Sequence, residues 1–159
     1  MKNQQELPET TFDGVKRSQF INGIATGSTP EDLKNRKKFI TDFYVKWVIL
    51  NPTKQVYNKS LESFIDVRFL SMQETASKAA IRYKSTLAVT YLTEILENAV
   101  IVGNPQEPKK ENVKQKRFSK MYVMEYDKVD FGKIKLTVGE LRGSGQKLQY
   151  CITAIGNDY

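Results

Sequence analysis

The sequence contains no histidine and only one cysteine, Cys151. Without histidine, the commonest general acid or base is missing, and so is the commonest protein ligand of transition metals. A single cysteine allows neither an intrachain disulfide nor a cysteine cluster that holds zinc. We therefore expect no metal site and no cofactor, and zinc and non-haem iron enzymes are set aside.

Long apolar runs are also missing. No stretch approaches the roughly 18 consecutive apolar residues that mark a membrane-spanning helix. The first nine residues are polar and lack the apolar centre of a signal peptide. Together with the low cysteine content, these features predict a cytoplasmic protein that does not contact a membrane.

Positive charge is in excess. Lys and Arg number 25 against 18 Asp and Glu, which gives a net charge of +7. Such a charge raises the local concentration of polyanions around a protein. Nucleic acid, with RNA favoured, is the expected partner, and a basic protein with no nucleic-acid role is the alternative.

The chain of 159 residues suits a single domain. We interpret residues 1–28 as a polar N-terminal arm that packs on the domain or on a partner, and 29–159 as one domain. Thr29 followed by Pro30 is typical of a helix start, and the apolar spacing predicts a helix over 30–43. The β-branched and aromatic run at 44–50 predicts a strand with Trp47 in the core.

Two further strands are expected in the first half, a short one at 56–57 and another over 63–69. Ser71 and Glu74 have the spacing of a capping box, and apolar residues then recur at helical spacing. This pattern predicts one long central helix that reaches about residue 102, with a candidate break near 83–85.

A loop over 103–117 and three strands complete the expected order. Residues 118–126, 133–138 and 147–154 alternate between apolar and polar side chains, as strands with one buried face do. The sequence therefore predicts an α+β fold: an N-terminal helix and one long central helix packed on a small antiparallel sheet with a C-terminal three-stranded meander.

Basic residues are concentrated in and just after the loop. We predict that they follow a phosphate backbone, with a solvated loop as the alternative. The candidate nucleic-acid-binding residues are Lys109, Lys110, Lys114, Lys116, Arg117, Lys120, Lys133 and Lys135. Lys133 and Lys135 also suit the solvent-exposed face of a strand.

The sequence shows no phosphate-binding glycine loop, no dinucleotide motif and no nucleophile elbow. RNA cleavage by internal transfer needs no metal, only a base, an acid and cations that stabilise the phosphorane. The last third of the chain contains these residue types: Glu125, Lys133, Lys135, Glu140, Arg142 and Tyr150. Tyr150 is in phase with apolar neighbours, so we interpret its ring as part of the core.

Two short stretches carry a resemblance. Residues 65–69, IDVRF, followed by 72–77, MQETAS, and residues 92–99, LTEILENA, resemble parts of the large polyvalent-protein-associated domains of phages and mobile elements, which are related to the Barnase–EndoU–colicin–RelE-like (BECR) nucleases. The resemblance covers roughly 44–155 and implies an α+β fold and RNase-like activity. Many of these domains carry a histidine soon after the serine, where this chain has Lys78. Either Lys78 and its neighbours replace the imidazole, or the fold is kept without the reaction.

Three hypotheses follow. The first is a metal-independent ribonuclease of toxin or phage type, whose catalytic candidates are Lys78, Arg82, Glu125, Glu140 and Arg142. The second is a non-catalytic nucleic-acid binder that uses the basic loop. The third is an inhibitor module that binds a host protein through residues 1–28.

Overall fold

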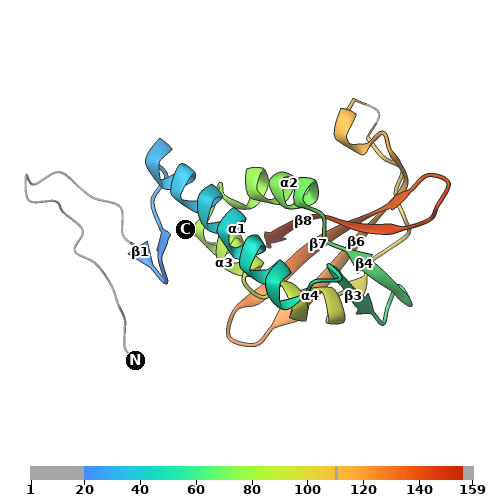
Figure 1. Ribbon diagram of the computed structural model, residues 1–159, viewed down its shortest axis with the longest axis horizontal. Coiled ribbons are helices and arrows are strands. Elements are labelled where there is room, and N and C mark those ends of the chain that lie inside the picture. The colour runs from blue at the N-terminus through green and yellow to red at the C-terminus, as the bar shows by residue number, and fades with distance from the viewer. Residues whose placement is uncertain (1–19, 110, 156–159) are drawn as a thin grey trace, which may run out of the picture.

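The computed structural model describes residues 20–109 and 111–155 and arranges them in two layers (Figure 1). Four helices lie over one face and one edge of a six-stranded sheet, and a two-stranded hairpin precedes them. The expected α+β class is confirmed. None of the helices in the described ranges is long and apolar enough to cross a bilayer.

Helix α1 (Pro30–Leu50) begins where the sequence predicted. The Thr29 hydroxyl accepts a hydrogen bond from the Asp32 amide, and the Asp32 carboxylate accepts one from the Thr29 amide, both at 3.1 Å. These two bonds satisfy amide groups that a helix start leaves without intrahelical partners.

The strand expected at 44–50 is wrong, because α1 continues to its end at Leu50. Ile40, Tyr44 and Trp47 are all buried and recur at helical spacing, so the stripe that faces the core does not stop at residue 43. This burial outweighs the preference of β-branched residues for strands. The expected burial of Trp47 is confirmed, and its indole N–H donates to the Thr93 hydroxyl at 2.9 Å.

The described part of the expected arm packs on α1 through Arg36, which is fully buried. Its Nη1 donates to the carbonyls of Ala25 and Gly27, both at 2.7 Å, and its Nε donates to the carbonyl of Ala80 at 2.6 Å. One guanidinium thus joins the arm, α1 and the segment after the second helix. The hairpin of the arm consists of β1 (Phe20–Ile21) and β2 (Ile24–Ala25). Residues 1–19 of the expected arm lie outside the described residues.

The expected strands at 56–57 and 63–69 are present as an antiparallel hairpin of β3 (Gln55–Asn58) and β4 (Ser63–Asp66). β4 ends three residues earlier than predicted, because Phe69 already begins the next helix.

The single long central helix is also wrong. The structure has three helices in its place: α2 (Phe69–Ala79), α3 (Tyr83–Val89) and α4 (Leu92–Asn98). Threonine hydroxyls bond to carbonyls at the breaks: Thr86 to those of Ala79 and Arg82, both at 3.0 Å, and Thr90 to that of Leu87 at 2.6 Å. Such side-chain bonds compete with a continuous helical ladder. The three helices bend around the sheet.

The predicted meander is present, formed by β6 (Phe118–Lys128), β7 (Gly132–Leu141) and β8 (Lys147–Ala154). The sheet order is β3-β4-β8-β7-β6-β5, where β5 is Val100–Ile101. β4 and β8 pair in parallel, so the sheet is mixed and not wholly antiparallel as predicted. The long connection through the helices makes a parallel pair possible.

The two faces of the sheet are different. Apolar residues such as Met124, Leu136 and Ile152 pack against the helices in the main core. On the opposite side, which we call the outer face, a small cluster forms from Phe118, Met121, Leu148 and Tyr150. The loop before β6 runs over this outer face, and the two together form the candidate site.

A candidate nucleic-acid interface around Tyr150

Strand β8 has a partly free edge. β4 pairs with it only at Lys147 and Leu148, and side chains of α2 and α3 cover the rest. Thr75 donates to the Tyr150 carbonyl at 3.3 Å, and the Ser85 hydroxyl accepts from the Ala154 amide at 2.9 Å. The first bond holds α2 and the second holds α3 beside β8, so Glu74 and Lys78 of α2 lie near Tyr150.

The register between β7 and β8 shifts at Tyr150. Thr137 pairs with Cys151 and Val138 with Gln149, which leaves Tyr150 as an extra residue in β8. Such bulges redirect a side chain and bend the strand. The Tyr150 ring packs edge-on against Phe118 at a centroid distance of 5.8 Å, so the interpretation of this ring as core is confirmed.

The loop before β6 is bonded to the body of the domain. Gln106 exchanges backbone hydrogen bonds of 2.7 and 2.8 Å with Met121, and the Gln115 side chain accepts from the Lys109 amide at 2.8 Å. At the end of the loop, Arg142 donates from Nε to the Lys116 carbonyl at 3.0 Å. These contacts place several basic residues of the loop around the outer face. A short 3-10 turn, η1, occupies Val113–Gln115.

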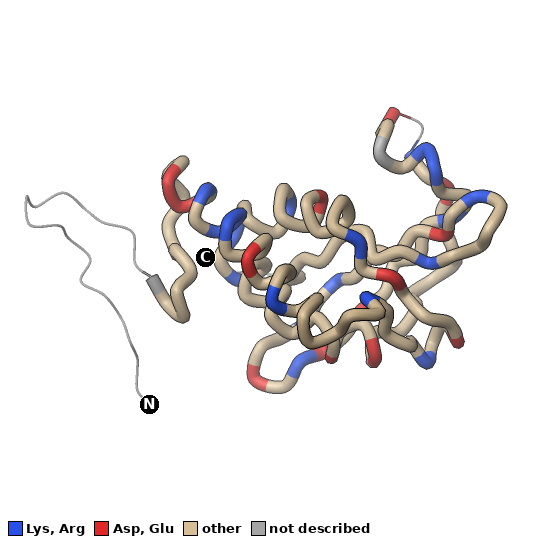
Figure 2. Tube along the Cα trace, in the orientation of Figure 1, with Lys and Arg blue, Asp and Glu red and all other residues tan. Residues whose placement is uncertain are grey.

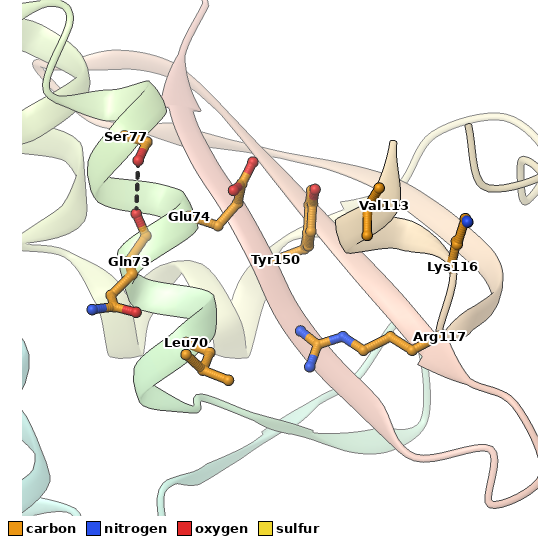
Figure 3. Close-up of a pocket in the computed structure, with 8 residues that line it drawn as sticks. All are labelled: Leu70, Gln73, Glu74, Ser77, Val113, Lys116, Arg117 and Tyr150. Carbon is orange, nitrogen blue, oxygen red and sulfur yellow. Dashed lines mark hydrogen bonds between the residues drawn. The ribbon is translucent and has the colours of Figure 1, made fainter. Parts of the chain in front are cut away.

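A hollow of about 640 Å³ lies between α2 and η1, and we call it the helix pocket. Figure 3 shows the Glu74 carboxylate next to the Tyr150 hydroxyl, with the Arg117 guanidinium reaching across toward Leu70. Leu70 and Val113 are largely exposed and supply opposite apolar walls. The lining residues are Leu70, Gln73, Glu74, Ser77, Val113, Lys116, Arg117 and Tyr150.

A second hollow of about 250 Å³ lies on the outer face, and we call it the sheet pocket. Tyr150 lines both hollows, so its side chain lies between them. We call the two together the Tyr150 cleft. Residues lining the sheet pocket include Lys78, Lys109, Lys135, Thr137, Cys151 and Thr153.

The environment of the cleft raises the pKa of two groups. Burial raises the pKa of the Tyr150 hydroxyl, and the nearby Glu74 carboxylate adds to this effect, whereas hydrogen bonds with Gln115 and Asn112 oppose it. Burial likewise raises the pKa of the Cys151 thiol to about 11, although the positive charges of Lys78 and Lys135 act in the opposite direction. Both groups therefore remain protonated near neutral pH.

The structure brings together several of the predicted residues. Lys78, Lys109 and Lys135 line the sheet pocket, and Lys116 and Arg117 line the helix pocket. Arg142 lines a third hollow of about 240 Å³, together with Lys109 and Lys116. Figure 2 shows basic positions at this end of the molecule, on the loop and on the turn between β7 and β8.

Other predicted residues lie elsewhere. Arg82 donates from Nη2 to the Ala154 carbonyl at 3.3 Å, which covers the edge of β8. Glu125 lies 3.2 Å from Lys133 in an ion pair on β6 and β7. Glu140 accepts from the Tyr122 hydroxyl at 2.9 Å. The five catalytic candidates therefore do not converge on one site.

Lys120 and Lys133 line neither hollow of the cleft, and the side chains of two further predicted residues are not described. Lys120 lies on β6 and is exposed, but it lines none of the hollows described above. Lys110 lies outside the described residues, and for Lys114 only the backbone, in η1, is described.

The sequence reasoning missed Glu74 as a site residue, because it interpreted this residue as the end of a capping box. The structure begins α2 at Phe69, with Arg68 at the cap and no side-chain cap bond, so the capping box is wrong. Glu74 is instead 6 % exposed, and Lys78 Nζ lies 4.0 Å from its carboxylate. The sequence did offer one signal for Glu74 as a site residue: a carboxylate placed among alanines and threonines on a helix face that is buried.

The cleft thus combines cations from α2, β7 and the loop with one buried carboxylate and one phenol. No family model, no curated protein and no solved structure matches this chain.

Proposed function

We propose that the Tyr150 cleft binds single-stranded RNA, and that the chain is an RNase-like domain of a phage or mobile element. The observation that carries the proposal is that five cations from three separate elements line the two hollows that share Tyr150: Lys78, Lys109, Lys116, Arg117 and Lys135. Cations that follow a phosphate backbone supply most of the affinity of proteins for nucleic acids.

The walls of the helix pocket suit a single strand better than a duplex. Leu70 and Val113 are 64 % and 73 % exposed and supply apolar surface on two sides of the hollow, on which an unstacked base can lie. Lys116 and Arg117 stand beside these walls and suit the phosphates on either side of that base. RNA rather than DNA follows from the resemblance to BECR domains over 44–155.

Salt dependence tests binding directly. The affinity for a single-stranded RNA is measured at several salt concentrations, and log K should fall with log salt by about 0.7 per phosphate contacted. The double variant Lys116→Gln/Arg117→Gln should weaken binding and lower this slope by about 1.4, which is two contacts. Lys46→Gln, an exposed position on α1, is the matched control. An affinity that does not depend on salt would rule out this mode of binding.

Metal-independent cleavage is the second candidate, and the pairing of Glu74 with Tyr150 favours it. In this reaction the Glu74 carboxylate takes the proton of the 2′-hydroxyl as its oxygen attacks phosphorus. The bond to the 5′-oxygen breaks, and Tyr150 donates the proton that this oxygen needs. Arg117 stabilises the extra negative charge on the phosphorane. The raised pKa of Tyr150 suits a group that holds its proton until this step.

The same RNA, incubated with EDTA, distinguishes cleavage from binding alone. Cleavage should leave 2′,3′-cyclic phosphate ends, and Glu74→Gln and Tyr150→Phe should each slow it by about 100-fold or more while RNA still binds. Intact RNA at high protein concentration, with binding retained, would leave the chain a binder without catalytic activity. Cleavage that is unchanged in both variants would show that these residues do not carry it.

A further inference from the structure

We propose that the sheet pocket receives a terminal phosphomonoester of the bound strand. This inference rests on the proposed function, since it takes the phosphate to belong to a nucleic-acid end. Three lysines from three different elements line this hollow: Lys78 from the last turn of α2, Lys109 from the loop and Lys135 from β7. Burial raises the pKa of the nearby Cys151 thiol, and the positive charges of Lys78 and Lys135 both oppose this effect, so these two cations lie near the same point.

Neutral donors complete the lining. Thr137 and Thr153 supply hydroxyls from the outer face of β7 and β8, and Gln106 and Gln115 supply amides from the loop. The sheet register places these hydroxyls beside the cations, because Lys135 pairs with Thr153 and Thr137 pairs with Cys151. A phosphate group accepts several hydrogen bonds at once, and charged donors make the strongest of them.

Charge also suits a monoester, which gains more from a positive pocket than a diester does. Three lysines and one acid, Glu107, line the sheet pocket, and the Glu74 carboxylate beside Lys78 offsets part of the positive charge. A phosphomonoester carries close to two negative charges at pH 7, because its second pKa is about 6. A diester inside a strand carries one. Glu74 lies toward the helix pocket, where it is 4.0 Å from Lys78.

The volume of the sheet pocket also favours a terminal phosphate. The volume of about 250 Å³ is below the roughly 300–1,000 Å³ of sites that enclose a drug-sized ligand. It suits a phosphate with part of a sugar, and the attached base then lies at Tyr150 and in the helix pocket. The end of the strand would therefore sit on β7 and β8, and the chain would continue past Tyr150 between α2 and η1.

Three oligonucleotides of one sequence test the proposal: one with a 5′-phosphate, one with a 3′-phosphate and one with hydroxyls at both ends. Affinities are measured at a fixed salt concentration for the wild type, Lys135→Gln, Lys78→Gln and the control Lys46→Gln. One of the phosphorylated strands should bind about fivefold or more tightly than the hydroxyl strand, which also identifies the end that is recognised. Lys135→Gln and Lys78→Gln should remove this preference, and Lys46→Gln should keep it.

Equal affinity for all three strands would overturn the inference and leave RNA binding intact. A preference that survives in the Lys78→Gln/Lys135→Gln double variant would overturn it as well. If none of the three oligonucleotides binds, the proposed function fails. A titration with inorganic phosphate then tests whether the sheet pocket binds phosphate at all. Amide NMR shifts at Thr137, Cys151 and Thr153 on titration with phosphate, absent in the double variant, would support a phosphate site. No shifts would refute it.

Discussion

The guanidinium Nε of Arg36 donates a 2.6 Å hydrogen bond to the carbonyl of Ala80, 44 residues away in the chain. The same side chain is 0 % exposed and also bonds to Ala25, Gly27 and Ile81. Burial lowers the pKa of Arg36, and the negative charge of Asp32 partly offsets this effect. One buried cation therefore organises backbone from three parts of the fold.

Arg36→Met should lower the free energy of unfolding by about 3 kcal/mol or more, since it leaves several buried carbonyls without a donor. Urea denaturation measures the change. Lys37→Met, at the next and exposed position of α1, should stay within about 0.5 kcal/mol of the wild type. A stable Arg36→Met protein would show that the carbonyls find other partners.

Gly139 lies under the ring of Phe118 on the outer face. A Cβ at this position would approach ring atoms of Phe118 to 2.6 Å, which is closer than real contacts allow. Gly139→Ala should therefore destabilise the protein by about 1–3 kcal/mol. In a Phe118→Leu background the same substitution should cost less, because the ring is gone. Equal costs in both backgrounds, measured in a double-mutant cycle, would contradict the contact.

Stability at acid pH should depend on Glu94. Its carboxylate accepts from the Tyr126 hydroxyl and from Lys128 Nζ, the latter at 3.0 Å, and these bonds lower its pKa below the ordinary value of 4.5. A lowered pKa in the folded state gives stability that is present above about pH 4.5 and is lost as the pH falls through the folded value.

Unfolding by urea at about pH 7, 4.5 and 3 tests this expectation. Glu94→Gln should lower stability most at neutral pH and converge with the wild type in acid. Glu97→Gln, an exposed position on the same helix, should follow the wild type throughout. Parallel curves for Glu94→Gln and the wild type would exclude this origin of the acid sensitivity.

The Cys151 thiol should react slowly. Its pKa of about 11 leaves little thiolate at pH 8, and the thiolate is the reactive form. Alkylation by iodoacetamide should be far slower than in urea-unfolded protein, and its rate should continue to rise above pH 9. A rate that levels off near pH 9 would indicate an ordinary thiol.

Strand alternation allowed the meander to be predicted from sequence. Ile134 and Leu136 are buried while Lys135 between them is exposed, and a pattern of period two reports this directly. The segment 44–50 was misjudged for a physical reason. Its composition favours a strand, but the burial of Tyr44 and Trp47 at helical spacing decides the outcome through tertiary contacts.

The cleft was predictable only in part. A run of basic residues is visible in the sequence, so the cations of the loop were identified, and Lys78 and Lys135 were chosen as well. The position of Glu74 beside Tyr150 was not visible, because it depends on α2 lying along the edge of β8, and the two residues are 76 positions apart in the sequence. Likewise, Glu140 and Arg142 share a strand region, yet one bonds to Tyr122 and the other to the loop.

The position of β8 inside the sheet also affects how the protein is made. β8 is the last described strand in the sequence, yet it joins the β3–β4 hairpin to β7, β6 and β5. During synthesis, both halves of the sheet leave the ribosome before β8. Until β8 is added, the edges of β4 and β7 that pair with it have unpaired backbone groups. Folding during synthesis should therefore be completed late, and chaperones that shield strand edges should matter most in that interval.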